Sequence, residues 1–335
     1  MSSVGSVSKA RVSPAAAPHA RFFFESDSHD GYGLLDRFVS RTNAQRPDFV
    51  LSGGDLSEVG SAKEQALLTD HIAPLKVPFR TIPGNHDYRG DAIGRFEAEF
   101  GNGNRSFDQG GVHFTLIDDA SQKISDQTFN FLEKDLAANE GKPTVVAMHV
   151  PAVWESTPGW VKALHKLMPD TIANFRIEDP AQRQRFTDLM SRHNVQLVLS
   201  GHTHVPGDAT VGGVRYVTAG ALGGKLDKIG VAHEYLDVSL ADGKVDVRHV
   251  ALDNPIKGVW DLVKSNARYL VGQFSAMDGK LPDAVAKLPD GIKNIPASVR
   301  DVPDKAGLLE RMIGGIKDIA SVAGDALKET LLHSH

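Results

Sequence analysis

The chain has 335 residues, a formal net charge of −5 and no cysteine. This length suits one large α/β domain with an appendage, or two domains. The lack of cysteine excludes disulfides and thiolate metal sites, so any metal must be held by histidine, aspartate, glutamate or asparagine. The acidic balance disfavours a nucleic-acid surface, because phosphate backbones require basic patches. No stretch reaches the roughly 20 apolar residues that span a bilayer.

Residues 1–20 are rich in serine, alanine and proline and contain no continuous apolar segment of the signal-peptide type. We therefore expect a flexible lead-in and a cytoplasmic protein.

The first predicted unit is a strand around residues 22–24 followed by a helix over residues 34–46. Between them lie Asp27 and His29, separated by one residue. In an extended or tightly turned backbone such side chains point the same way, so one metal ion could take both.

Two further units place polar residues at strand ends in the same manner. A strand over residues 48–52 is followed by Asp55, and a helix over residues 61–72 leads to a strand over residues 77–82. Asn85 and His86 follow that strand in a Pro-Gly turn. Strand–helix–strand alternation implies parallel pairing, so these ends are expected on one edge of one sheet.

The second half of the pattern adds three histidines. A strand over residues 111–118 and a helix over residues 129–136 precede an apolar strand over residues 143–148, which ends at His149. After a helix over residues 183–193, a strand over residues 195–200 runs into His202 and His204, again separated by one residue. We expect closing antiparallel strands at the end of this region: residues 215–218, 234–238 and 245–250.

Residues 154–180 break the pattern and are expected to be an irregular insertion. Its Trp154, Trp160 and Arg176 suit either a cover over the substrate's leaving group or ordinary loop packing.

From residue 253 to residue 335 the sequence changes in kind. Proline recurs every seventh residue from Pro282 to Pro303, which forbids one continuous straight helix, and an apolar helical face follows from residue 305 to residue 332. We expect a C-terminal helical tail that packs on its own domain or mediates self-association; peripheral docking to a membrane or partner is the alternative.

Each polar cluster taken alone has an ordinary structural explanation. Asp27 and Asp55 could be helix N-caps, His149 a satisfied buried histidine, and His202 and His204 a surface pair. Together, at successive strand ends, they indicate a site with the oxygen and nitrogen ligands that divalent transition metals accept.

Five short motifs resemble the five blocks of the calcineurin-like metallophosphoesterase superfamily, across about residues 22–252. They are Asp27-Ser28-His29, Gly54-Asp55, Gly84-Asn85-His86-Asp87, the lone His149, and Gly201-His202-Thr203-His204. The phrasing around residues 53–86 is most similar to the class III cyclic-nucleotide phosphodiesterase and glycerophosphodiesterase branch. The resemblance implies an α/β (α+β) fold, a two-sheet β-sandwich flanked by helices in four αββα layers. It predicts a domain over residues 21–252, between the lead-in (1–20) and the tail (253–335).

The resemblance also implies two metal ions, of manganese, iron or zinc. Asp27, His29 and His204 would hold the first ion, Asn85, His149 and His202 the second, and Asp55 would bridge them. His86 would not ligate but would assist the leaving group. Two divalent ions, two aspartates and a bridging hydroxide leave a site of about +1, which suits a phosphate ester anion.

One position departs from the family pattern. Three residues after Asp55, where relatives often carry Asp or Asn that in some branches orients the catalytic histidine, stands Glu58. Its longer carboxylate could reach His86.

The function predicted from this resemblance is a metal-dependent hydrolase of small-molecule phosphate esters. Diesters are favoured over monoesters because of the branch and because no cationic clamp for a dianion is recognisable. Alternatives are a phosphomonoesterase acting on nucleotides or sugar phosphates, and a non-catalytic scaffold, although scaffold relatives typically lose ligands that are all present here. A nuclease is disfavoured by the acidic charge.

Overall fold

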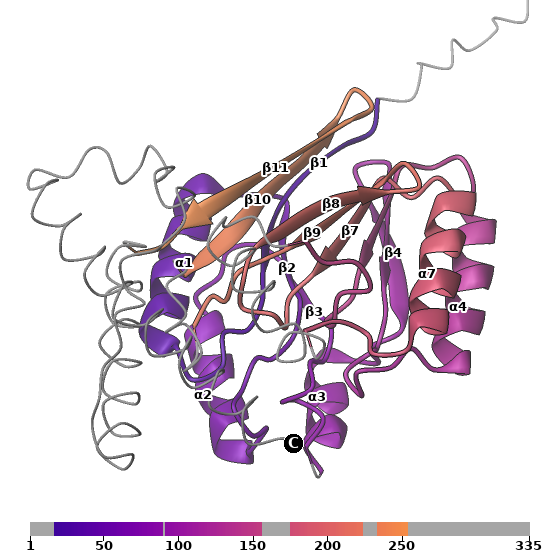
Figure 1. Ribbon diagram of the computed structural model, residues 1–335. Helices are drawn as coiled ribbons and strands as arrows, with labels where there is room; N and C mark the ends of the chain where they lie inside the picture. The colour runs from indigo at the N-terminus through magenta and orange to yellow at the C-terminus, as the bar shows by residue number, and fades with distance from the viewer. Residues whose placement is uncertain (1–16, 90, 156–174, 224–232, 254–335) are drawn as a thin grey trace, which may run out of the picture.

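The computed structural model describes residues 17–89, 91–155, 175–223 and 233–253 (Figure 1). The expected tail, most of the 154–180 insertion and residues 1–16 of the lead-in lie outside these ranges. Within them, no helix combines the length and the apolar character needed to cross a bilayer.

In the described part of the chain, the first sheet has five strands in the order β11-β10-β1-β2-β3. β1, β2 and β3 run parallel, as their βα connections require, and β10 and β11 extend the sheet by antiparallel pairing. The bounds are β1 (His19–Glu25), β2 (Phe49–Ser52), β3 (Phe79–Thr81), β10 (Glu234–Ala241) and β11 (Lys244–Ala251).

The second sheet has six strands among the described residues, in the order β4-β5-β6-β7-β9-β8. β5, β6, β7 and β9 are parallel, and β4 and β8 pair antiparallel at the two edges. The bounds are β4 (Arg105–Gln109), β5 (Val112–Leu116), β6 (Thr144–Ala147), β7 (Leu197–Ser200), β8 (Gly207–Val211) and β9 (Val214–Thr218).

The expectation that residues 215–218 form an antiparallel closing strand holds on one side only, because β9 pairs antiparallel with β8 but parallel with β7. β8, which the sequence did not reveal, forms a hairpin with β9 through Gly212 and Gly213, both at positive φ. The hairpin turns the chain back, so β9 runs parallel to β7. Residues 234–238 and 245–250 do lie in antiparallel strands, as expected.

The core lies between the sheets and is rich in phenylalanine. Phe22 of β1 stacks on Phe49 of β2 with ring centroids 5.0 Å apart, and it meets Phe114 of β5 edge-on at 5.2 Å. Alternation along β1 turns Phe22 and Phe24 towards the other sheet and Phe23 towards the helices.

Helices cover the outer faces of both sheets and complete the four layers (Figure 1). They are α1 (Tyr32–Gln45), α2 (Ala62–Ile72) and α3 (Ala92–Phe100) on the first sheet, and α4 (Asp126–Ala138) and α7 (Pro180–Arg192) on the second. The sandwich flanked by helices confirms the predicted fold class. α3 and β4 were not predicted.

Candidate metal centre

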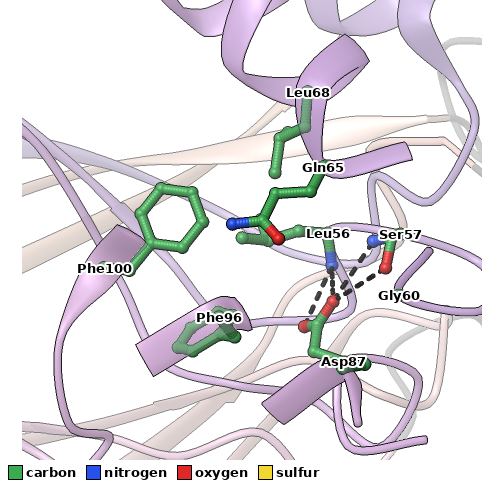
Figure 2. A pocket seen from close by; sticks show the side chains of 9 residues that line it. Leu56, Ser57, Gly60, Gln65, Leu68, Asp87, Phe96 and Phe100 are labelled. Atoms are coloured by element: carbon green, nitrogen blue, oxygen red, sulfur yellow. Dashed lines mark hydrogen bonds between the residues drawn. The ribbon is translucent and has the colours of Figure 1, made fainter. Parts of the chain in front are cut away.

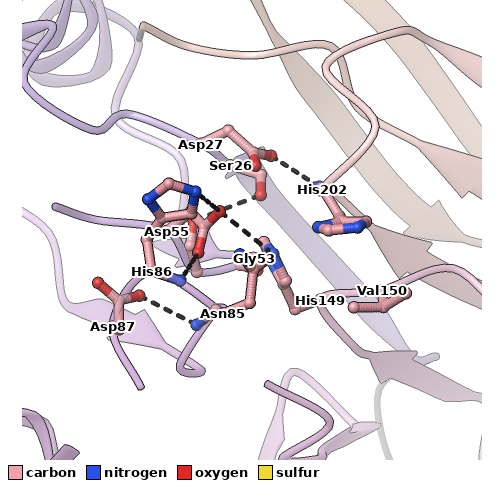
Figure 3. A network of polar contacts seen from close by, with 12 residues as sticks. Ser26, Asp27, Gly53, Asp55, Asn85, His86, Asp87, His149, Val150 and His202 are labelled. Atoms are coloured by element: carbon pink, nitrogen blue, oxygen red, sulfur yellow. Dashed lines mark hydrogen bonds and ion pairs between the residues drawn. The ribbon is translucent and has the colours of Figure 1, made fainter. Parts of the chain in front are cut away.

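The candidate ligands follow the carboxyl ends of strands from both sheets. They are Asp27 and His29 after β1, Asp55 after β2, Asn85 and His86 after β3, His149 after β6, and His202 and His204 after β7. A hydrogen bond joins the two sets, because the His202 backbone N–H donates to Asp27 Oδ2 at 2.9 Å (Figure 3). The structure thus brings together at one place the seven predicted metal ligands and His86.

The alternative that Asp27 and Asp55 cap helices is excluded. α1 begins after Gly31, and α2 begins after Ser61, whose side chain forms a capping box with Glu64.

The backbone at the ligands is unusual. Asp27, His29, Asp55, His202 and His204 all have φ between 45° and 67°, in the left-handed region that side chains other than glycine rarely adopt. Four other non-glycine residues of the described chain share it. Such strain persists only where surrounding structure enforces it, and it clusters at functional sites.

Two glycines allow the aspartates to approach. A Cβ atom on Gly84 would lie 2.2 Å from Asp55 Oδ1, and one on Gly201 would lie 2.6 Å from Asp27 Oδ2. Any larger residue would displace a candidate ligand, so both positions require glycine.

Asp27, His29 and His204 form the first group, and their ligand atoms lie within 4.8 Å of one another. His204 Nε2 is 3.2 Å from Asp27 Oδ1 and 3.3 Å from His29 Nε2. Both Nδ1 atoms are buried; that of His204 has no hydrogen-bond partner in the described residues, and that of His29 has only the Glu58 carboxylate at 3.5 Å. Two imidazole nitrogens and a carboxylate that converge in this way fit a cation, which can satisfy all three at once.

Asp55, His149 and His202 form the second group within the same limit. His149 Nδ1 donates to the Gly53 carbonyl at 2.8 Å, which leaves Nε2 to face Asn85 Oδ1 at 3.1 Å. A backbone carbonyl that fixes the tautomer in this way is typical of metal-ligating histidines.

Asp55 lies between the groups (Figure 3). Its Oδ2 atom is 3.4 Å from His149 Nε2, in the second group, and 3.8 Å from His29 Nε2, in the first. Its other oxygen accepts the backbone N–H of His86 at 2.7 Å. One carboxylate therefore faces both groups, as a bridging ligand must.

His86 stands at the opening of this cluster, with its side chain 19% exposed. Its Nδ1 atom donates to the backbone carbonyl of Glu58 at 2.6 Å, and its Nε2 atom is 4.0 Å from Asp55 Oδ2. Glu58 thus reaches His86 through its backbone, whereas its carboxylate lies 3.5 Å from His29 Nδ1. The side-chain contact expected from the sequence is replaced because the loop turns the carbonyl, and not the carboxylate, towards His86.

Sequence reasoning missed Arg89, whose Nη2 atom lies 3.2 Å from His86 Nε2. Its only signal was its place three residues after His86.

The electrostatics show two carboxylates that require positive charge. Burial works against ionisation of Asp27, yet the neighbouring histidines, His204 foremost, outweigh it and hold its pKa below the usual range. Asp55 behaves likewise beside His149. The histidines show the reverse balance: burial opposes their charge, but Asp55 raises the pKa of His149 and Asp27 that of His204. For His29, burial dominates and lowers the pKa.

Asp87 joins the loop after β2 to the loop after β3. Its buried carboxylate accepts the backbone N–H groups of Leu56 at 3.1 Å, Ser57 at 3.3 Å and Gly84 at 3.0 Å. It lines a cavity of about 20 Å³ whose wall includes Phe96, room for about one water molecule (Figure 2). Burial, and then the charge of Asp55, raises the pKa of Asp87 to about 7.

Asp119 supports the backbone of His149 in the same way, and sequence reasoning missed this residue. Its two oxygens accept the backbone N–H groups of His149 at 2.8 Å and Val150 at 2.9 Å. Burial raises the pKa of Asp119 to about 7.

Of the insertion, Trp154 is packed into the domain. It is 9% exposed, and its Nε1 atom donates to the Val205 carbonyl at 3.2 Å. This favours ordinary packing for Trp154. Arg176 is exposed, and Trp160 lies outside the described residues.

Comparison with known proteins agrees with the fold. The chain matches the calcineurin-like phosphoesterase family over residues 20–206, more than half its length, and belongs to that family. Among solved structures it is similar to a dimetal phosphatase from Danio rerio, with a TM-score of 0.55 and 13% identity, over 71% of this chain and 98% of that one. It is also similar to purple acid phosphatase PPD1 from yellow lupin, with a TM-score of 0.54 and 16% identity, over 72% and 52%.

Its curated relatives are phosphodiesterases, which confirms the branch indicated by the motifs. The glycerophosphodiester phosphodiesterase GpdQ of Enterobacter lignolyticus is 29% identical over an alignment that covers 38% of this chain and 53% of that protein. This chain thus matches about half the length of that relative. The 3',5'-cyclic-nucleotide phosphodiesterase alr5338 of Nostoc sp. is 24% identical over 54% of this chain and 66% of its own length.

Proposed function

We propose that this protein is a binuclear metal-dependent phosphoesterase that hydrolyses phosphate diesters of the cyclic-nucleotide or glycerophosphodiester type. The observation that carries the proposal is the placement of Asp55, whose Oδ2 atom faces a histidine of each group. The preference for diesters is supported by the branch to which the curated relatives belong.

Two ions of manganese, iron or zinc would be held by the residues of the two groups, with Asn85 completing the second and Asp55 shared. Bound metals would supply Lewis acidity towards the phosphoryl group and acidify a water molecule for attack. The mixed oxygen and nitrogen ligands suit all three elements.

The protein's own residues then position and release the leaving group. His86 keeps Nδ1 hydrogen-bonded to the Glu58 carbonyl, and its Nε2 atom, which accepts the Arg89 N–H in the free protein, would carry a proton once a bound phosphoryl group takes over the Arg89 contact. That proton is directed to the leaving oxygen, which departs through the opening beside His86. General acid assistance of this kind is worth about 10²–10⁴-fold in rate.

A phosphomonoesterase remains the second candidate. Arg89 supports it, because this cation beside His86 is a partner for the second charge of a monoester dianion.

The test is hydrolysis of bis(p-nitrophenyl) phosphate and p-nitrophenyl phosphate by metal-stripped protein reloaded with Mn²⁺, Fe²⁺ or Zn²⁺. We expect activity to return with metal and to favour the diester. Monoester preference would select the second candidate, and inactivity with every ion would overturn the enzyme assignment.

A matched pair of variants separates catalysis from a scaffold role. His86→Ala should lower turnover by about 10²–10⁴-fold while metal content stays unchanged. The control is His71→Ala. His71 lies on α2 and pairs with Asp36 of α1, so its loss should change neither turnover nor metal content. If His86→Ala leaves turnover intact, the assigned role of His86 is wrong.

A further inference from the structure

Arg89 differs from the other charged residues around the metal centre because no acidic side chain neutralises it. Within the described ranges its guanidinium makes one polar contact, from Nη2 to His86 Nε2 at 3.2 Å, and no ion pair. Arg95, on the neighbouring helix α3, is by contrast bonded to Asp91 and to the Gly60 carbonyl, both at 2.6 Å. The Arg89 guanidinium is therefore an exposed cation beside His86 that can bind an anionic ligand.

The position of Arg89 directs that charge to the substrate's phosphoryl group. From the interior outwards, exposure rises from the Asp55 side chain (2%) to His86 (19%) and then to exposed Arg89. Because His86 Nε2 and Arg89 Nη2 are 3.2 Å apart, a single oxygen placed between them can lie within hydrogen-bond distance of both.

The charges around His86 indicate which substrates Arg89 would bind more tightly. The Glu58 carboxylate, 3.5 Å from His29 Nδ1, adds a negative charge to the rim that the ligand set does not need. A phosphate diester carries one negative charge, whereas a monoester or inorganic phosphate carries up to two, and a guanidinium binds such oxygens with charge-assisted hydrogen bonds.

We propose that Arg89 is a substrate-binding residue whose guanidinium holds a non-bridging phosphoryl oxygen beside His86 and sets the tolerance of the site for phosphate dianions. This inference rests on the proposed function. It assigns to Arg89 the cationic clamp that the sequence did not reveal, and it predicts that phosphate and monoester products bind more tightly than the metal ligands alone would allow.

The test compares Arg89→Met and Arg89→Lys with Arg192→Met, an exposed arginine in the last turn of α7 at the opposite end of the strands. kcat and KM are measured for p-nitrophenyl phosphate and for bis(p-nitrophenyl) phosphate, which share a leaving group but differ in charge. Calorimetry of inorganic phosphate with the metal-loaded protein gives a readout that does not depend on turnover. Metal content and thermal unfolding are recorded for each variant.

We expect Arg89→Met to weaken phosphate binding and lower kcat/KM for the monoester by about 10- to 100-fold, the range of a charged hydrogen bond, with less than about a tenfold loss for the diester. Arg89→Lys should recover part of the loss because it keeps the charge but not the planar fork. Arg192→Met should match the wild type.

Equal losses for both substrates, or unchanged phosphate affinity in Arg89→Met, would overturn the inference. A wild-type protein inactive with every metal would instead defeat the proposed function, so the two failures are distinguishable.

Discussion

In the described part of the chain, the histidines of the metal centre and His113 of β5 are buried in clusters that are built in opposite ways. In the metal centre, His29 and His204 direct their Nε2 atoms at each other across 3.3 Å; His204 Nδ1 has no hydrogen-bond partner in the described chain, and His29 Nδ1 lies 3.5 Å from the Glu58 carboxylate. On β5, His113 donates from Nδ1 to Asp108 at 2.7 Å and from Nε2 to Asp135 at 2.9 Å. The ligand atoms of the first cluster converge as a cation requires, whereas the second is complete as it stands, with both nitrogens of His113 hydrogen-bonded to carboxylates.

The backbone repeats the contrast. His113 lies inside a regular strand, whereas His29 and His204 lie in loops at positive φ. A histidine that only stabilises the fold needs no such strain. Unsatisfied nitrogens combined with a strained backbone therefore distinguish a functional cluster from a structural one.

The strongest way to break this comparison is to remove one carboxylate charge from each cluster. Asp55→Asn keeps an oxygen for the His86 N–H but removes the charge shared by the two metal groups. We expect turnover to fall by on the order of 10³-fold, since the shared charge supports several kcal/mol of metal-assisted catalysis, and metal content to drop. Asp108→Asn, in the cluster of His113, should change neither. Turnover retained in Asp55→Asn would refute the two-metal scheme.

A smaller effect is expected from the carboxylate behind His149. Asp119→Asn places an amide N–H against the His149 and Val150 N–H groups that Asp119 now satisfies. His149 should shift, and metal affinity should fall by about 10- to 100-fold, as for other residues that support metal ligands. Competition with a chelator measures this affinity. Asp118→Asn, next in the chain, should leave it unchanged, and an unaltered affinity in Asp119→Asn would show that His149 is held by other contacts.

Much of the site could be predicted from the sequence because parallel βα units bring strand ends to one edge, so Asp27, Asp55 and His149 were found from spacing alone. The missing parts carry no such pattern. β4 is an edge strand that alternates half-buried and exposed residues, so it has no apolar run. The Glu58 carbonyl is a backbone group that every residue has, so the residue type does not indicate its contact with His86. The burial of Asp119 depends on tertiary packing, which the sequence does not display.

The smallest effect should come from the structural cluster, and it should appear in stability. His113 lies between Asp135 and Asp108, and Lys142 also pairs with Asp108. Burial disfavours its charge, but the two carboxylates outweigh burial and raise the pKa of His113. A folded pKa above the unfolded value of about 6.5 gives stability that is complete below that pH and is lost as pH rises through the folded pKa.

His113→Gln should therefore lower the free energy of unfolding by about 1–3 kcal/mol at pH 6, mainly through Asp135, because Asp108 is exposed and solvent-screened. The difference from wild type should be smaller at pH 9 than at pH 6, because a rising pH removes the charge of His113 in the folded protein as well. Urea unfolding at the two pH values measures it, and turnover and metal content should match the wild type at both. A deficit of equal size at pH 6 and pH 9 would mean that His113 acts as a neutral hydrogen-bonding group. A loss of bound metal would mean that the two clusters are coupled, and the contrast between them would then fail.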